Sequence, residues 1–263
     1  MQHFFQVIIL CSLGLLQSQS VFAHNHKTIK VGIDHWPPFS MLIHSKQEGS
    51  MASGIDLEVM ALVAKGLQSK LVIIPCPFKR CLSMMKTGQI DMLTSLQFTQ
   101  ARQAYMHFVT PHYYSSNKVF YTLKASNIKI DRYSDLLPLS IGLTLGHHNN
   151  VQFDEDTLLN KTLVPNDNQL FTMLSHDRLD TILSVEITAN YYINQFGLGS
   201  DIQKMSFGFQ GTKGYLAISK KSWLAQYQEQ VNRLLNELIQ QGEVQGLINN
   251  FLITTEHKQH KVN

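Results

Sequence analysis

The first 23 residues contain no lysine or arginine, and no later stretch is long and apolar enough to cross a membrane. Phe4 to Leu16 is almost wholly apolar but is too short to span a bilayer comfortably. Val21-Phe22-Ala23 has the small-residue pattern of a signal peptidase site, and Ile9-Leu10 before Cys11 makes a poor lipobox. We therefore expect residues 1–23 to be a signal peptide, cut after Ala23, and the mature chain to be periplasmic. An N-terminal membrane anchor is the alternative.

Strong charge of one sign is also lacking. The 22 lysines and arginines against 19 aspartates and glutamates leave a formal net charge of +3, too small and scattered to indicate nucleic-acid binding. The sequence shows no Ser–His–Asp arrangement, phosphate loop or metalloprotease motif. We expect no cofactor and no metal site within the fold.

Cysteine is scarce, and only Cys76 and Cys81 remain after the expected cleavage. An oxidising compartment would allow them to form a disulfide. They flank Pro77-Phe78-Lys79-Arg80, so a bridge would close a small loop and would require a tight turn. The sequence leaves the bridge and two free thiols both open.

Strand and helix patterns alternate along the chain. The order strand–helix–strand–helix–strand predicts a mostly parallel sheet with helices on its faces. The first set of expected elements is Thr28–Ile33, Ile55–Leu67, Leu71–Ile74, Phe78–Lys86 and Ile90–Leu93. Further on we expect strands at Leu139–Thr144 and Gly214–Ser219, a helical stretch at Trp223–Phe251 and a loose polar tail from Thr254.

Two segments of the chain resemble each other. Leu82–Ser95 and Phe171–Ser184 align without a gap, each with a helix end, a turn, an Ile/Leu-Asp pair and an apolar strand. The alternative is that the match arises by chance, or from the strand and helix patterns that all α/β sequences share. If the match is real, it predicts two similar α/β lobes with a cleft between them. Such sheets bind ligands beyond the carboxyl ends of their strands.

Two hydroxyls and an arginine follow one of these strands. Thr94 and Ser95 end the apolar strand, and Arg102 follows at the start of a polar helical turn. Arginine offers a planar fork of donors that fits a carboxylate, and hydroxyls can fill the remaining lone pairs. The group therefore predicts an anion site, although an arginine on a solvated helix start has the same spacing.

Several motifs, in this order, resemble those of the type II periplasmic solute-binding proteins, the amino-acid-binding class (family 3). They are Gly32–Phe39 (GIDHWPPF), Gly54–Leu57, Gly88–Asp91, Thr99–Arg102, Phe108 with Tyr113-Tyr114, Ile141–Leu143 with Gly146, and Arg178–Asp180. The resemblance covers essentially the whole mature chain.

The resemblance implies an α/β fold of two lobes, each a mostly parallel sheet flanked by helices. Residues 24–118 with 215–263 would form a discontinuous first lobe, and residues 119–214 the second. Two crossover strands, near Lys118–Thr122 and Gly214–Ile218, would join them. The protein would be a monomer that captures a small ligand by hinge closure and hands it to a membrane ABC permease.

The resemblance also implies roles for residues of the first lobe. Arg102 would clamp the ligand's carboxylate, assisted by Ser95 and the backbone near Gln97. Trp36 and Phe78 match positions where aromatic rings sandwich the ligand, with plain core packing as the alternative for each ring. Asp34 follows a strand and would shape its end or form a salt bridge across the cleft.

The second lobe departs from the family pattern. The aspartate that usually holds an ammonium group is replaced by Val185, with Glu186 next, and a register shift would be needed for Glu186 to serve. The loop that usually supplies hydroxyls is His147-His148-Asn149-Asn150, which could start an anion-binding helix. We therefore expect a carboxylate-bearing small molecule, an amino acid or a related organic acid. The candidate ligand-binding residues are Asp34, Trp36, Phe78, Thr94, Ser95, Gln97, Arg102, His147, His148, Asn149 and Glu186.

Two other functions remain open. One is a cleft enzyme of the cyclohexadienyl dehydratase kind, for which Glu186, His147 and Asp34 would be the acid–base candidates. The other is a stand-alone ligand sensor. Separately, a mature terminus His24-Asn25-His26 could bind Cu(II) or Ni(II) in a square plane, or could simply be loose. We expect the protein not to be an enzyme.

Overall fold

The computed structural model describes residues 27–45 and 49–257. The expected signal peptide and the His24-Asn25-His26 terminus lie outside these residues. Across the described ranges, no helix is both long enough and apolar enough to span a bilayer.

The first half of the molecule begins with a parallel sheet. Strand β1 (Thr28–Ile33) pairs in parallel with β4 (Lys70–Pro75) and with β5 (Met92–Leu96). Helices α1 (Ile55–Gly66) and α2 (Phe78–Thr87) connect these strands, and a hairpin of β2 (Met41–Ser45) and β3 (Gly49–Ser53) precedes α1. The alternation predicted from the sequence is present, with the hairpin as an unexpected addition.

The second half repeats the parallel arrangement. Strand β8 (Ser140–Thr144) lies between β9 (Asn160–Val164) and β10 (Thr181–Val185), parallel to both. The helices of this half are α4 (Val151–Glu155), α5 (Asp167–Ser175) and α6 (Glu186–Gln195).

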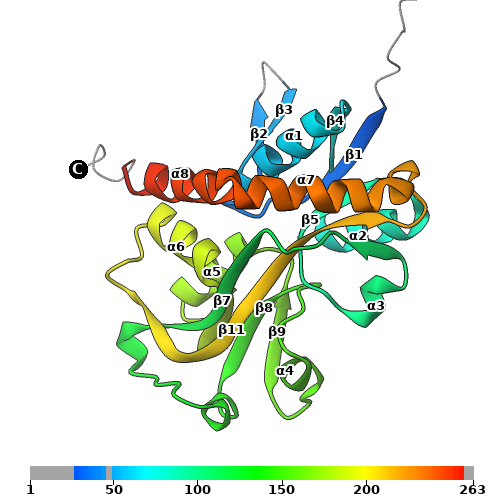
Figure 1. Ribbon diagram of the computed structural model, residues 1–263. Coiled ribbons are helices and arrows are strands. Elements are labelled where there is room, and N and C mark those ends of the chain that lie inside the picture. The colour runs from blue at the N-terminus through cyan, green and yellow to red at the C-terminus, as the bar shows by residue number, and fades with distance from the viewer. Residues whose placement is uncertain (1–26, 46–48, 258–263) are drawn as a thin grey trace, which may run out of the picture.

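Two long antiparallel strands join the halves. Strand β7 (Tyr114–Leu123) pairs with β11 (Ile202–Ser219), and β11 continues into the first half to pair with β5 and β6 (Met106–Phe108). Figure 1 shows β11 running from the lower half of the molecule into the upper half. The resulting strand order is β4-β1-β5-β11-β7-β10-β8-β9. The expected crossover segments near Lys118–Thr122 and Gly214–Ile218 fall within β7 and β11.

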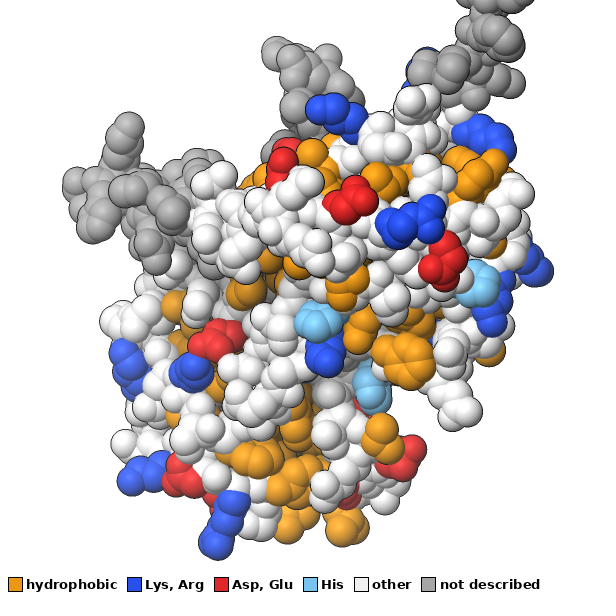
Figure 2. All heavy atoms as spheres, viewed as in Figure 1, with side chains coloured by type: hydrophobic (Ala, Val, Ile, Leu, Met, Phe, Trp, Pro, Cys, Tyr) orange, Lys and Arg blue, Asp and Glu red, His pale blue; other side chains and the backbone are white. Residues whose placement is uncertain are grey.

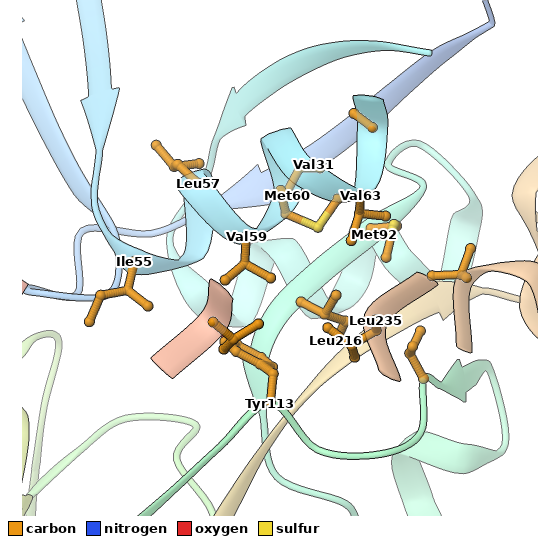
Figure 3. Close-up of a cluster of buried hydrophobic side chains, with 14 of the residues drawn as sticks. Val31, Ile55, Leu57, Val59, Met60, Val63, Met92, Tyr113, Leu216 and Leu235 are labelled. Carbon is orange, nitrogen blue, oxygen red and sulfur yellow. The ribbon is translucent and has the colours of Figure 1, made fainter. Parts of the chain in front are cut away.

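The C-terminal helices pack on the first half. Helices α7 (Gln228–Gln240) and α8 (Glu243–His257) lie across α1 (Figure 1). Val231 and Leu235 of α7 belong to the same buried cluster as Val59 and Met60 of α1. Figure 3 shows Leu235, Val59 and Met60 in this cluster. The first half is therefore built from both ends of the described chain. The shorter helical elements are α3 (Gln100–Gln103) and the 3-10 turns η1 (Lys124–Ser126), η2 (Tyr133–Leu136) and η3 (Trp223–Tyr227).

Each half has its own hydrophobic interior. One cluster, around Val31, Ile55 and Leu216, and a neighbouring one around Met85 and Ile90 fill the first half. Two further clusters, drawn from residues between 119 and 209, fill the second. Separate interiors allow the halves to move as bodies about their connecting strands.

The disulfide that the sequence left open is formed. Cys76 and Cys81 are bonded, with their Cα atoms 5.5 Å apart, and tie the end of β4 to the first turns of α2. Both residues are buried.

The sequence repeat has a structural counterpart. The carboxylate of Asp91 accepts a 2.7 Å hydrogen bond from the backbone N–H of Lys30 in β1. In the second half, the carboxylate of Asp180 accepts a 2.7 Å hydrogen bond from the backbone N–H of Ser140 in β8. Each aspartate follows a helix–turn and fixes the neighbouring strand of its own sheet, so the repeated Ile/Leu-Asp pair marks the same structural position twice.

Candidate functional site

A pocket lies between the two halves, at the carboxyl ends of their parallel strands. Asp34 follows β1, Thr94 and Ser95 lie near the end of β5, Thr144 ends β8 and Val185 ends β10. This is the edge where sheets of this kind bind ligands. The sequence candidates that line the pocket are Asp34, Trp36, Phe78, Thr94, Ser95, Gln97, Arg102, His147 and His148.

Arg102 forms one wall of the pocket and is only 8% exposed. Its backbone N–H donates to the Thr99 hydroxyl, which caps α3, and its guanidinium donates to the Gln97 carbonyl at 2.9 Å. A second guanidinium bond, 3.1 Å long, crosses to the Gly146 carbonyl of the other half. Burial lowers the pKa of Arg102. Among the described residues, no carboxylate oxygen lies within 4.0 Å of this side chain, so the buried cation is held by carbonyl oxygens alone.

Ser95 lines the pocket while its hydroxyl is engaged within the first half. It donates to the carboxylate of Asp56 at 2.8 Å and lies 2.8 Å from the hydroxyl of Tyr113. Tyr113 in turn donates to Asp56. Ser95 has a left-handed backbone, with φ of 55°, which its surroundings must stabilise. The network fixes the end of β5 beside Arg102.

Three rings meet in the cleft. The His147 imidazole packs edge-on against Phe78, with centroids 5.5 Å apart, and against Trp36 at 6.0 Å. Trp36 also stacks on Phe39 at 4.6 Å. Burial lowers the pKa of His147 to about 3, and the positive charges of Lys118 and Arg102 add to this effect. His147 is therefore neutral at physiological pH and acts as an aromatic wall contributed by the second half.

Asp34 serves both the strand end and the pocket. Its two carboxylate oxygens accept backbone N–H groups, from His35 at 2.8 Å and from Phe78, the first residue of α2, at 2.9 Å. Burial raises its pKa, and these hydrogen bonds oppose that rise.

Lys118 of β7 was not among the sequence candidates as a ligand residue. It lines the pocket, is 4% exposed, and donates to the His148 carbonyl at 2.6 Å and the Asn149 side chain at 2.8 Å. Burial lowers its pKa to about 8, while Asp154 and Asp167 oppose the shift. Its place on a strand expected to cross between the lobes was the available signal.

Two sequence candidates do not line the pocket. Asn149 lies behind it, where its amide bonds Lys118 and Asp154. Glu186 begins α6 and forms an ion pair with Lys204. The register shift that would bring Glu186 into the pocket does not occur, because β10 ends with Val185 facing it. His147, His148 and Asn149 form a loop, and Asn150 is the N-cap of α4, with its side chain accepting from the Phe153 N–H.

Asp167 is a pocket residue that the sequence candidates omit. It is the first residue of α5, as Phe78 is the first residue of α2. Extending the ungapped alignment of Leu82–Ser95 with Phe171–Ser184 upstream places Phe78 opposite Asp167. The repeat therefore contained the signal that could have found it.

Acidic and basic side chains are interspersed on the face seen in Figure 2, without a continuous patch of one sign. Among residues 27–45 and 49–257, no group of three or more His, Cys, Asp or Glu side chains is arranged to hold a metal ion.

Two α/β halves, two connecting strands and a pocket at the facing strand ends define a binding protein of the type II periplasmic fold. The model of the bacterial extracellular solute-binding proteins, family 3, matches residues 29–254, and the chain belongs to this family.

Relatives and solved structures agree with this assignment. A probable amino-acid-binding protein, YxeM, of Bacillus subtilis is 24% identical over 226 residues, covering 81% of each chain. A probable histidine-binding protein of Campylobacter jejuni is 24% identical over 176 residues, 65% of each. Among structures, the amino acid ABC transporter substrate-binding protein AbpA of Streptococcus pneumoniae, bound to L-arginine, has a TM-score of 0.75 at 19% identity, covering 87% of this chain and 95% of that one. An ancestral arginine-binding protein bound to arginine has a TM-score of 0.74 at 20% identity, covering 87% and 99%.

Proposed function

We propose that the mature, periplasmic protein captures a small carboxylate-bearing molecule, an amino acid or a related organic acid, in the pocket between its lobes. The lobes are residues 24–118 with 215–263, and residues 119–214. A monomer with ligand bound would present itself to a membrane ABC permease. The family and the relatives reported above are described as binding proteins, and this description does not favour the dehydratase alternative.

The buried guanidinium of Arg102 carries this proposal. A cation that is 8% exposed and bonded to neutral carbonyl oxygens has lost much of its hydration without gaining an anionic partner. A ligand carboxylate supplies that partner, in the two-pronged geometry that a guanidinium prefers. Phe78, whose ring lies 5.5 Å from the guanidinium carbon, keeps water from that side.

The lobes also meet at this residue. The guanidinium bond to Gly146 and the His147 ring contacts both cross the cleft. A ligand held by Arg102 would therefore contact both lobes at once, which is the condition for binding energy to drive closure.

Arg102→Ala tests the anchor. We would screen the purified mature protein for thermal stabilisation by the common L-amino acids, the matching 2-oxo acids and other small organic acids. Affinities of the hits would be measured by calorimetry. The variant should lose at least about 100-fold in affinity, which corresponds to roughly 3 kcal/mol. Arg178→Ala, an exposed arginine outside the pocket, is the matched control and should bind like the wild type.

Wild-type affinity in a folded Arg102→Ala variant would rule out the anchor. Incubating the hits with wild-type protein and analysing them by mass spectrometry adds an independent readout. Turnover of a hit would replace the binding function by an enzymatic one.

A further inference from the structure

The end of β10, where the family resemblance implies an acid, is apolar in this protein. Val185 lines the pocket there, and the neighbouring acid Glu186 pairs with Lys204 away from it. A ligand ammonium enclosed in the pocket without an anionic partner would be strongly disfavoured. Either the ligand has no cationic group, or another acid that lines the pocket binds it, and the acids there are Asp34, Asp56 and Asp167. Both oxygens of Asp56 already accept hydrogen bonds from the Ser95 hydroxyl, and one of them also accepts from Tyr113.

Asp167 is placed to be that acid. It is 5% exposed, lines the pocket and belongs to the second lobe. The Thr144 hydroxyl donates to its Oδ1 at 3.1 Å. Among the described residues, no lysine, arginine or histidine nitrogen lies within 4.0 Å of its carboxylate.

The surrounding charges leave Asp167 short of positive partners. Lys118 is close enough to favour its charged form, but the Lys118 ammonium is bonded to the His148 carbonyl and the Asn149 amide. Asp34, from the opposite lobe, acts in the other direction. Burial raises the pKa of Asp167 to about 6, opposed by the Thr144 hydrogen bond, the Lys118 charge and its own backbone N–H.

We propose that Asp167 determines specificity by binding a cationic group of the ligand, so that the pocket accepts zwitterions such as amino acids and rejects the corresponding 2-oxo acids. The inference rests on the proposed function, in which Arg102 holds the carboxylate at the other end. In this proposal the negative charge that faces the ligand comes from Asp167 at the start of α5. The residue at the end of β10, Val185, is uncharged.

A purely structural role explains less of the geometry. The cap of α5 is Asn166, whose side chain accepts the Gln169 N–H at 2.9 Å, so Asp167 is not needed as a cap. Asp34, by contrast, already spends both oxygens on backbone N–H groups. The carboxylate of Asp167, bonded by the Thr144 hydroxyl and by its own backbone N–H, keeps lone pairs that can accept donors from a ligand.

Calorimetry on matched ligand pairs tests the proposal. Each common L-amino acid that binds the wild type is compared with the 2-oxo acid of the same side chain. We expect the 2-oxo acid to bind at least about 10-fold more weakly. Asp167→Asn, which keeps the size of the side chain and an acceptor for Thr144, should lose roughly 10- to 100-fold in amino-acid affinity. The affinity of this variant for the 2-oxo acid should change much less than its affinity for the amino acid.

Glu186→Gln is the matched control, because it removes the other acid at this end of the second lobe. It should bind amino acids within about twofold of the wild type. A 2-oxo acid that binds wild type as tightly as its amino acid overturns the role of Asp167, and this comparison needs no variant. Unchanged binding by Asp167→Asn, or a loss confined to Glu186→Gln, overturns it too.

The two proposals fail in different ways. If 2-oxo acids bind and Arg102→Ala abolishes their binding, the anchor stands and the assignment of Asp167 falls. If no carboxylate-bearing compound of either series binds the wild type, the proposed function falls and takes this inference with it.

Discussion

Charged side chains in the pocket are held mainly by neutral hydrogen-bonding groups. Arg102 and Lys118 donate to carbonyl and amide oxygens, and Asp34 accepts from backbone N–H groups. Buried charges without opposite charges beside them retain a large part of their desolvation cost. A ligand that brings complementary charges recovers this cost, so each residue is stabilised more in the complex than alone.

His147 should make the stability of the protein pH-dependent. Its pKa of about 3 in the folded state lies below its ordinary value of 6.5. Above pH 6.5 it is neutral in both states, so it contributes no pH dependence. As the pH falls from 6.5 toward 3, the unfolded chain binds a proton that the folded protein does not, and stability is lost.

The test is His147→Gln, with free energies of unfolding from urea titrations at pH 7 and pH 5. The wild type should lose about 1 kcal/mol more than the variant over this range, since a half-buried ring is partly screened. Asp167, with its raised pKa, acts oppositely between pH 3.8 and about 6, but it is present in both proteins and cancels. Parallel pH profiles of the two proteins would contradict the assignment.

Nine of the eleven sequence candidates line the pocket, because topology decides which residues reach it. Residues directly after parallel strands, such as Asp34, and the Arg102 turn after β5 face the cleft in any fold of this order. The position of Glu186 was harder to predict from the sequence. Val185 ends β10 and faces the pocket, whereas Glu186, the next residue, begins α6 and does not line it. Lys118 and Asp167 were missed although the sequence held a signal for each, the expected crossover strand for Lys118 and the repeat for Asp167. Neither signal shows that the charge is buried beside a ligand, because burial depends on tertiary packing.

At the scale of elements, agreement with the sequence follows local signals. Strand β1 has its predicted bounds, because β-branched residues precede a proline pair. Strand β5 begins at Met92 instead of Ile90, since Asp91 is used to bond β1. The predicted strand at Gly214–Ser219 is only the end of β11, whose earlier residues are rich in glycine and polar side chains. Its pairing with β7 over long sequence separation is a tertiary effect.

Two helix glycines should respond differently to alanine. At Gly246 in α8, a Cβ atom would have nothing within 4 Å, so Gly246→Ala should stabilise the fold by about 0.5–1 kcal/mol. At Gly66, the last residue of α1, a Cβ atom would lie 2.8 Å from Leu234 Cδ2 of α7. Gly66→Ala should gain less than Gly246→Ala or lose stability, because the terminal methyl groups of Leu234 must shift to make room.

Urea unfolding of both variants against the wild type measures this difference. The two glycines are matched because both lie in helices with ordinary backbone angles. Equal stabilisation by both alanines would show that the α1–α7 contact is loose enough to absorb a methyl group.

At the scale of the whole molecule, one loop of the second lobe makes the contacts across the cleft described above. Gly146 accepts from Arg102, and the His147 ring packs on Trp36 and Phe78. Gly146 has φ of 87°, and a Cβ there would lie 3.3 Å from the Phe78 ring, so glycine lets the loop approach closely. The residues that this loop contacts are also those proposed to hold the ligand, which couples binding to closure.

His147→Ala should therefore shift the protein toward an open form. Each ring contact contributes about 0.5–1.5 kcal/mol, so losing both should change the open–closed equilibrium by roughly 10-fold. Small-angle X-ray scattering of the ligand-free protein would detect a larger radius of gyration. Saturating ligand should restore the compact value, because the proposed contacts of Arg102 and Asp167 with the ligand are still available in the variant. His148→Ala is the matched control, since the His148 side chain pairs with Asp154 inside the second lobe. If both variants scatter like the wild type, the connecting strands β7 and β11 set the angle between the lobes, and the His147 contacts only follow it.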